Sequence, residues 1–424
     1  MKKLLLLIFA IAAAWTVVAN DSIPGVEHYL PNNNEDRELS LPENFDVNMD
    51  SLFQDWHVKN FIPIDLNCKF DSLNPYVSDS VIIRRLAMMP TVIKMPFNKV
   101  VRTCIDKYAG DRRKQVAVML GISDYFFPLY EQTLEKYNMP NELKYLSIVE
   151  SALNPNARSS VGATGLWQFM FMTGKIYGLE VNSLLDDRRD PVKSTDAAVR
   201  YLKDLYGIFS DWHLAIAAYN CGPGNVNKAI KRAGGKKDYW EIYPYLPRET
   251  RGYVPLFIAA SYVMTYYKEH KICPVRTDYP LHTDTLILNS RMHFDQISAV
   301  IGISKRELNL LNPQYRAEII PASLEKPMSI CLPANFTLSF IDNQDSIYSY
   351  GSDSLIQHAL TIEPAKEEAK AVVKPKAKYK IHKVRTGDTL SEIADRYRTS
   401  VSTIRKNNKI KGSMIVPGMR LKIY

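Results

Sequence analysis

The sequence predicts an α+β protein, in which a predominantly α-helical domain is followed by small modules of the order strand, helix, helix, strand. Two observations support this class. Apolar residues recur at helical intervals from residue 78 to about residue 270, and after Cys273 the pattern changes to short runs of strand and helix character. The length of 424 residues leaves room for several such domains.

The N-terminal nineteen residues have the composition of a secretory signal. Lys2 and Lys3 precede an uncharged run from Leu4 to Val18, and Ala19 offers a small residue for cleavage. We therefore predict an exported protein. An uncleaved membrane anchor is the alternative, although the run is shorter than the roughly 20 residues that span a bilayer. A lipid anchor would need a cysteine at the cleavage point, and the first cysteine is Cys68.

The helical domain is predicted over residues 78–270, after a polar lead-in at 20–77. Helix starts and turns are marked inside it by Pro140, by Asp190-Pro191 and by Gly222-Pro223-Gly224. These signals divide the domain into several helices.

Two modules and a linker follow the helical domain. Residues 279–335 begin and end with strand-like runs and contain two helix-like runs between them. Residues 336–376 end in Ala, Glu, Lys and Pro, which is a linker composition. Residues 377–424 again predict strand, helix, helix, strand.

The positive charge belongs to the C-terminal tail. The chain has 54 Lys and Arg against 45 Asp and Glu, and fourteen of the basic residues lie between Lys374 and Lys422 against three acidic ones. Nucleic acid is not the expected partner, because the chain is predicted to be exported and no stacking aromatics alternate with the Lys-Pro repeat. Attraction to an anionic polymer such as a cell-wall glycan fits better.

The cysteines and histidines predict neither a metal site nor a cofactor site. The chain has no Cys-x-x-Cys or His-Glu-x-x-His arrangement, and its eight histidines are scattered. Five cysteines are an odd number, so at least one has no partner within the chain.

Glu150 is the candidate general acid. Pro140 starts a helix, Leu143, Leu146 and Val149 give it an apolar face, and Asn154-Pro155 ends it soon after Glu150. A carboxyl group between a packed helix and a cleft loses solvation, which raises its pKa toward the value that an acid working near neutral pH needs. By itself, a glutamate at a helix end is usually a surface residue, so the surrounding motifs decide.

Four motifs occur in order along the helical domain. They are ESALNPNARS at 150–159, GATGLWQFM at 162–170, AAYNCGPG at 217–224 and ETRGYV at 249–254. Together they resemble the motifs of the lytic transglycosylases, which cleave peptidoglycan and have a lysozyme-like catalytic domain. The resemblance implies that this domain is lysozyme-like and that the chain acts on glycan strands in the periplasm.

The resemblance also implies roles for single residues. Glu150 is the catalytic acid, and Ser159 hydrogen-bonds the acid and the muramoyl sugar. The residues expected to line the groove or to position acid and sugar are Gln168, Met170, Tyr219, Asn220 and Tyr253. On composition alone, Met170 and the tyrosines would be assigned to the core.

The reaction implied by the resemblance needs only one carboxylate. Glycosidases usually use two, but there is no Asp or Glu between Glu150 and Glu180, although Asp211 or Glu249 could approach through space. The N-acetyl group of muramic acid would stabilise the cation, and Glu150 would then deprotonate the C6 hydroxyl to leave a 1,6-anhydro end. A hydrolytic muramidase of the same fold and a non-catalytic wall-binding scaffold are the alternatives.

The tail resembles a LysM module, which binds glycans that contain N-acetylglucosamine. The matching letters are YKIHKV at 379–384, RTGDTLSEIA at 385–394 and VPGMRL at 416–421. Residues 279–335 resemble a degenerate copy through Asp284-Thr285-Leu286 and Leu311-Asn312-Pro313, without the glycine of the Gly-Asp-Thr-Leu turn. Packing is at least as good an expectation for that copy as sugar binding.

Overall fold

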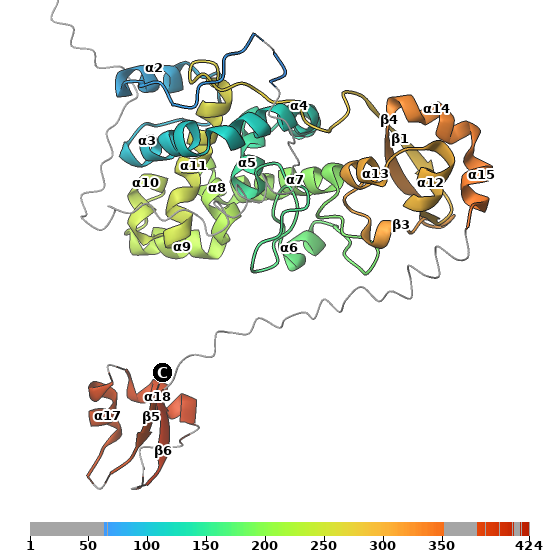
Figure 1. Ribbon diagram of the computed structural model, residues 1–424. Helices are drawn as coiled ribbons and strands as arrows, with labels where there is room; N and C mark the ends of the chain where they lie inside the picture. The colour runs from blue at the N-terminus through green and yellow to red at the C-terminus, as the bar shows by residue number, and fades with distance from the viewer. Residues whose placement is uncertain are drawn as a thin grey trace, which may run out of the picture. The chain divides into compact units, whose positions relative to one another are not determined.

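The computed structural model describes residues 63–351 apart from Leu66, and residues 380–423 apart from 386, 398, 409, 411–415 and 417. The predicted signal at 1–19, most of the lead-in and the linker from 352 to 376 lie outside the described residues. The chain forms two compact units that divide at residue 362 (Figure 1). The first unit contains the helical domain and the first module, and the second contains the tail.

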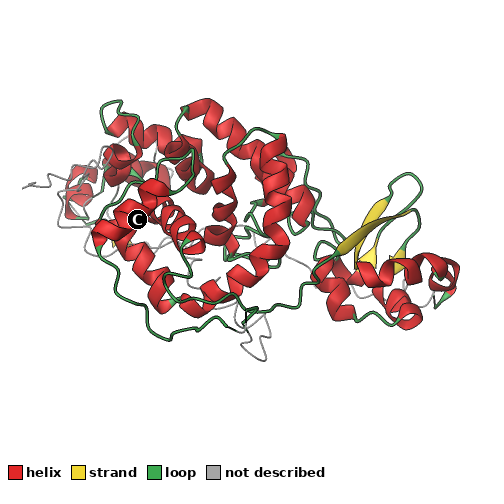
Figure 2. Cartoon of the chain, turned by 90° about the horizontal axis from the view of Figure 1, so that it is seen from above, coloured by secondary structure: helices red, strands yellow, loops and turns green. Residues whose placement is uncertain are grey.

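The helical domain confirms the predicted class (Figures 1 and 2). Its helices are α2 (Asp79–Met88), α3 (Lys99–Asp106), the π-helix η2 (Lys107–Asp111), α4 (Arg113–Lys136), the 3-10 helix η3 (Asn141–Tyr145), α5 (Leu146–Ser151), α6 (Phe171–Ile176), α7 (Pro191–Phe209), α8 (Trp212–Cys221), α9 (Pro223–Arg232), α10 (Tyr239–Ile242), the 3-10 helix η4 (Tyr243–Tyr245) and α11 (Arg248–Thr265).

Helix α11 is the central element of this domain. Nearly all of its side chains from Gly252 to Met264 are buried, as expected for a helix that is apolar on every face. It packs against α3, α8 and α5, so α5 is held inside the domain. The predicted helix start at Asp190-Pro191 is also confirmed, because Asp190 Oδ1 accepts the backbone N–H groups of Val192 and Lys193 at 2.9 Å.

The first module has the predicted strand–helix–helix–strand order with additions. Its elements are β1 (Thr283–Leu288), β2 (Met292–His293), α12 (Phe294–Ile301), α13 (Lys305–Leu311), the 3-10 segment η5 (Arg316–Glu318), β3 (Ile319–Ile320), β4 (Met328–Pro333), α14 (Ala334–Asp342) and α15 (Gln344–Ser349). Strands β1 and β4 pair antiparallel, with Thr285 opposite Cys331, and β2 pairs with β3. Figure 2 shows these strands in one small body beside the helical domain.

Two predictions for this module were wrong. The linker does not begin at residue 336, because α14 and α15 cover the module and bury Phe340 and Ile347 in its core. The prediction rested on the Ala, Glu, Lys and Pro composition at the end of this stretch, which was extended too far toward the N-terminus. The match of Asp284-Thr285-Leu286 to the Gly-Asp-Thr-Leu turn is also wrong, because these residues lie within β1, the strand-like run with which the module was predicted to begin.

The tail confirms the predicted order. It consists of β5 (Lys380–Lys383), α17 (Leu390–Arg396), α18 (Val401–Asn408) and β6 (Arg420–Ile423), and β5 pairs antiparallel with β6. A small core forms from Val384, Leu390, Ile393, Ala394, Ile404, Leu421 and Ile423.

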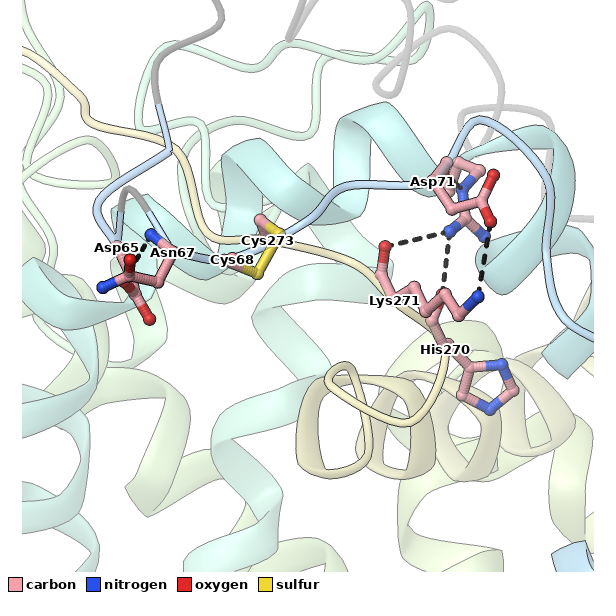
Figure 3. The surroundings of a disulfide bond; sticks show 8 residues. Asp65, Asn67, Cys68, Asp71, His270, Lys271 and Cys273 are labelled. Carbon is pink, nitrogen blue, oxygen red and sulfur yellow. Dashed lines mark hydrogen bonds and ion pairs between the residues drawn. A yellow bond between two sulfur atoms is a disulfide. The ribbon is translucent and has the colours of Figure 1, made fainter.

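A disulfide joins the lead-in to the chain that leaves α11 (Figure 3). Cys68 bonds Cys273, which is 205 residues away in the sequence. The Arg113 guanidinium donates to the carbonyls of Asp71 (2.8 Å), His270 (2.8 Å) and Lys271 (3.2 Å) and fastens the same two segments. The expectation of at least one unpaired cysteine is confirmed by Cys104, Cys221 and Cys331. None of the helices in the described part of the chain is long and apolar enough to cross a bilayer.

Candidate active site

Glu150 lies on the last turn of α5, as the sequence predicts. The helix ends because Ala152 and Leu153 adopt left-handed backbone angles, with φ of 51° and 63°. Non-glycine residues in this region are strained and persist only where packing holds them. Both side chains are almost fully buried, so the core fixes the helix end and with it the position of Glu150.

The Glu150 carboxyl group is half-buried and bonded to a tyrosine. Burial raises its pKa to about 7, and the hydrogen bond that the Tyr253 hydroxyl donates to Oε1 opposes this by stabilising the carboxylate. Desolvation therefore outweighs the tyrosine. At neutral pH a large fraction of Glu150 carries a proton, which is the state that a general acid needs.

Two predicted tyrosines join Glu150 from different helices. Tyr253 of α11 is 1% exposed, and Tyr219 comes from α8. The Tyr219 hydroxyl donates to the carbonyl of Trp167 at 2.8 Å. Burial and the neighbouring Glu150 charge raise the pKa of both tyrosines well above the ordinary value, so both stay protonated as donors.

Asn220 connects α8 to the start of α11. Its Oδ1 accepts a hydrogen bond from the buried Thr250 hydroxyl at 2.9 Å. Thr250 belongs to the fourth motif, but the sequence analysis did not single it out. Its signal was available, because a threonine just after the start of an apolar helix has to bury its hydroxyl against a partner.

The loop from residue 152 to residue 170 carries Ser159 and Gln168, and both are buried. Ser159 Oγ accepts the N–H of Ala163 at 3.0 Å. Gln168 has a φ of 47°, and its Nε2 donates to the carbonyls of Ala157 (3.1 Å) and Gly165 (2.9 Å). Gln168 Oε1 is buried and has no hydrogen-bond partner in the described part of the protein.

Met170 lies on the surface and not in the core that composition favours. Its side chain is 44% exposed, whereas Phe169 beside it is 2% exposed. Phe171 and Met172 at the start of α6 are exposed as well. Apolar side chains therefore cover the outside of the segment that carries Gln168.

The two distant acids that could have approached Glu150 through space, Asp211 and Glu249, both have other surroundings. Asp211 caps α8, where its Oδ1 accepts the N–H of Leu214 at 2.8 Å, and Glu249 is exposed on the first turn of α11.

Arg188 supports the loop and was missed by the sequence analysis. Its Nη1 donates to the carbonyls of Gly162 (3.1 Å) and Phe169 (3.4 Å), and its Nε and Nη2 bind the buried carboxylate of Asp186. The signal was the run of five charged residues at 186–190, of which only the helix start at Asp190 was used.

One group of possible metal ligands lies in the first module, away from Glu150. His293, Asp295 and Glu318 place one ligand atom each within 4.8 Å of one another. The Lys305 ammonium already binds Asp295 Oδ1 and Glu318 Oε2, each at 2.9 Å, and so takes the place that a cation would occupy.

Three parts of the chain match known families. Residues 128–242 match the Transglycosylase SLT domain, residues 282–349 match the LysM-like domain of lytic transglycosylase MltD, and residues 382–423 match the LysM domain. Over 333 residues the chain is 33% identical to membrane-bound lytic murein transglycosylase D of Escherichia coli strain K12, with 78% of this chain and 70% of that protein covered. The chain belongs to this family of lytic transglycosylases.

This assignment confirms the family resemblance and the lysozyme-like character of the helical domain. The soluble lytic murein transglycosylase of Escherichia coli strain K12 is 31% identical over 157 residues, which cover 34% of this lytic transglycosylase and 24% of that one. The solved structure of the 70 kDa soluble lytic transglycosylase of Escherichia coli is 20% identical, covers 50% of this chain and 41% of its own, and gives a TM-score of 0.32.

Proposed function

We propose that this lytic transglycosylase cleaves the bond between N-acetylmuramic acid and N-acetylglucosamine in peptidoglycan without water and leaves 1,6-anhydro-muramoyl ends. The observation that carries the proposal is the half-buried Glu150, whose pKa of about 7 reflects burial opposed by the hydrogen bond from Tyr253. One group is then available as acid in the first step and as base in the second.

In the first step, Glu150 gives its proton to the leaving glycosidic oxygen. The N-acetyl group of the muramoyl sugar attacks or shields the positive charge at C1, which replaces the second carboxylate of ordinary glycosidases. The Tyr253 hydroxyl then stabilises the carboxylate that forms. In the second step, Glu150 takes the proton of the C6 hydroxyl while that oxygen bonds to C1 and the N-acetyl oxygen leaves C1. The N-acetyl group and the protonated Glu150 are thereby restored.

The remaining residues hold the sugar. The unpartnered Oε1 of Gln168 accepts from an N–H or O–H of the glycan, and Ser159 offers its hydroxyl proton from the same loop. Met170 packs its exposed side chain on an apolar sugar face. Tyr219 and Asn220 keep α8 in place against the loop and against α11.

We further propose that the chain is exported and works on the cell wall in the periplasm. The disulfide between Cys68 and Cys273 supports this, because such bonds persist in oxidising compartments. The basic tail adds attraction to an anionic wall polymer and, as a LysM module, would bind its sugars.

The test is cleavage of purified sacculi by Glu150→Gln, with the exposed Glu249→Gln as the matched control. We expect Glu150→Gln to lose activity by about 10³-fold or more, because general acid catalysis has no substitute there. Mass spectrometry of the wild-type products should give ends that lack one water relative to hydrolysis. Reducing ends would support the muramidase, and full activity of Glu150→Gln would remove the acid from the mechanism.

A further inference from the structure

The loop of residues 180–190 contacts both the first module and the loop of residues 152–170, which carries Ser159 and Gln168. Residues 180–190 leave the helical domain and return to it, and at its centre Leu185 is fully buried in the core of the module. The two backbones are hydrogen-bonded there, since Asp186 N donates to the carbonyl of Gln314 at 2.9 Å and Arg316 N donates to the carbonyl of Leu184 at 2.8 Å. The module is thus docked through this loop.

A chain of charges runs through the same contact. Asp186 is fully buried, and its Oδ2 binds both Arg188 Nη2 at 2.8 Å and Arg316 Nη2 at 3.0 Å. Burial alone would raise the pKa of Asp186, but the two arginines lower it below the ordinary value, so the carboxylate is charged. A buried charge of this kind is stable only while its partners stay in place.

At the other end of this series of ion pairs, Arg188 contacts the loop that carries Ser159 and Gln168. Arg188 uses its remaining donors to hold the carbonyls of Gly162 and Phe169, on the two sides of the loop that carries Ser159 and Gln168. This loop also lies tightly on the Arg188 backbone, because a Cβ at Gly165 would be 1.8 Å from the Arg188 carbonyl oxygen. A displacement of Arg188 would therefore move the loop that carries Ser159 and Gln168.

We infer that Arg316 of the docked module is a positioning residue for the active site, acting through Asp186 and Arg188 on the loop with Ser159 and Gln168. The inference rests on the proposed roles of those two residues. Arg316 fixes the carboxylate from the module side, and the carboxylate in turn fixes the orientation of Arg188. The module then helps to position the loop that carries Ser159 and Gln168, in addition to any sugar contact of its own.

The test compares Arg316→Ala with Lys326→Ala in the full chain. Lys326 also joins the module to the helical domain, through an exposed ion pair with Glu180, but it has no contact with the chain of charges. Arg316→Ala should fold, because Arg188 still binds both oxygens of Asp186. Arg316→Lys is the conservative variant, since its ammonium can still reach one oxygen.

Two measurements decide the result. With soluble glycan fragments as substrate, Arg316→Ala should raise KM by about 3- to 10-fold, with the pH dependence of kcat unchanged because Glu150 and Tyr253 are untouched. Hydrogen exchange of the backbone amides in residues 158–170 should accelerate by a similar factor. Lys326→Ala should leave both values at wild type, and Arg316→Lys should recover part of each.

The inference is overturned if exchange at 158–170 and KM stay at wild-type values in Arg316→Ala. Equal changes of KM and hydrogen exchange in Lys326→Ala would also overturn it, since the cause would then be a weaker attachment of the module and not the loss of the Arg316 ion pair. The exchange measurement does not depend on catalysis. Retained activity in Glu150→Gln would therefore contradict the proposed mechanism without touching this result.

Discussion

The two modules have the same local structure but belong to different compact units of the chain. The first module is in one unit with the helical domain, and the tail forms the second unit. In the first module, His293 caps α12 and exchanges hydrogen bonds with Gln296, and in the tail Thr389 does the same with Glu392 on α17. Further along, Asn312 bonds the N–H and carbonyl of Cys331 at 2.8 Å each, and Asn408 bonds those of Lys422 at 2.7 and 2.9 Å. The capping residue and the asparagine are separated by the same number of residues in both modules.

The difference between them lies outside this shared plan. The segment between α13 and β4 is longer than its counterpart in the tail, and its extra residues form β3, which pairs with β2 and buries Met292 and Ile319. The first module also takes Leu185 from the helical domain into its core. In contrast, the described core residues of the tail all come from the second unit. The same fold therefore serves as a fixed part of the enzyme body in one copy and as a separate unit in the other.

The largest test of this contrast is a pair of core truncations, Leu185→Ala and Ile404→Ala. Both side chains are almost fully buried, so each substitution should cost about 2–4 kcal/mol of its unit's stability. Leu185→Ala should lower the melting transition of the enzyme body in calorimetry and reduce cleavage. Ile404→Ala should lower only the transition of the tail.

Cleavage of soluble glycan fragments is the control for this pair. It should stay at the wild-type rate in Ile404→Ala. A lower transition of the enzyme body in that variant would show that the two units are not independent, and an unchanged body transition in Leu185→Ala would contradict the docking of the first module.

A smaller effect is expected from deleting residues 377–424. Retention on insoluble peptidoglycan should fall about tenfold, because one of the attachment points is lost. Cleavage of soluble fragments should be unchanged, because Glu150 and the described residues that surround it all belong to the first unit. Sedimentation with sacculi measures retention, with Glu150→Gln in both forms so that the sacculi stay intact.

Salt sharpens the same experiment. The charge-dependent part of the tail's retention should weaken as ionic strength rises, whereas direct sugar contacts should remain. If full-length and shortened chains sediment equally, the tail is not the wall anchor.

Local signals made the centre of the site predictable. The prediction of one helix starting at Pro140 was right about the helical stretch but not about its type, because the 3-10 helix η3 follows Pro140 and α5, which carries Glu150, begins only at Leu146. The predicted end before Asn154-Pro155 is confirmed. Tyr219 and Tyr253 followed from motifs, and their approach to Glu150 then depends on the packing of α8 and α11, for which the sequence gives no distances. Asp284-Thr285-Leu286 was matched to the wrong part of the LysM module because three letters were compared. The separation between the capping residue and the asparagine, which defines the repeat, was not used.

Contacts between distant segments were not predictable in this way. Cys68 and Cys273 are paired across 205 residues, and five cysteines alone allow many pairings. Leu185 looks like an ordinary core residue of the helical domain, and only the structure shows it inside the module. The pairing of Arg316 with Asp186 has the same character, because these residues are 130 positions apart in the sequence, whereas Asp186 and Arg188 lie in one run of charged residues.

The smallest expected effect concerns pH and separates catalysis from anchoring. Glu150 must be protonated to begin the reaction, and its pKa is about 7, so kcat/KM on soluble fragments should fall as pH rises above this value. The full chain and the chain without residues 377–424 should share this alkaline limb. Tyr253→Phe removes a donor that stabilises the carboxylate, so the pKa of Glu150 should rise and move the limb upward by about half a pH unit. A limb that moves downward in Tyr253→Phe would mean that the hydroxyl favours the protonated acid, and a limb that moves on deletion of the tail would mean that the separate unit reaches the active site.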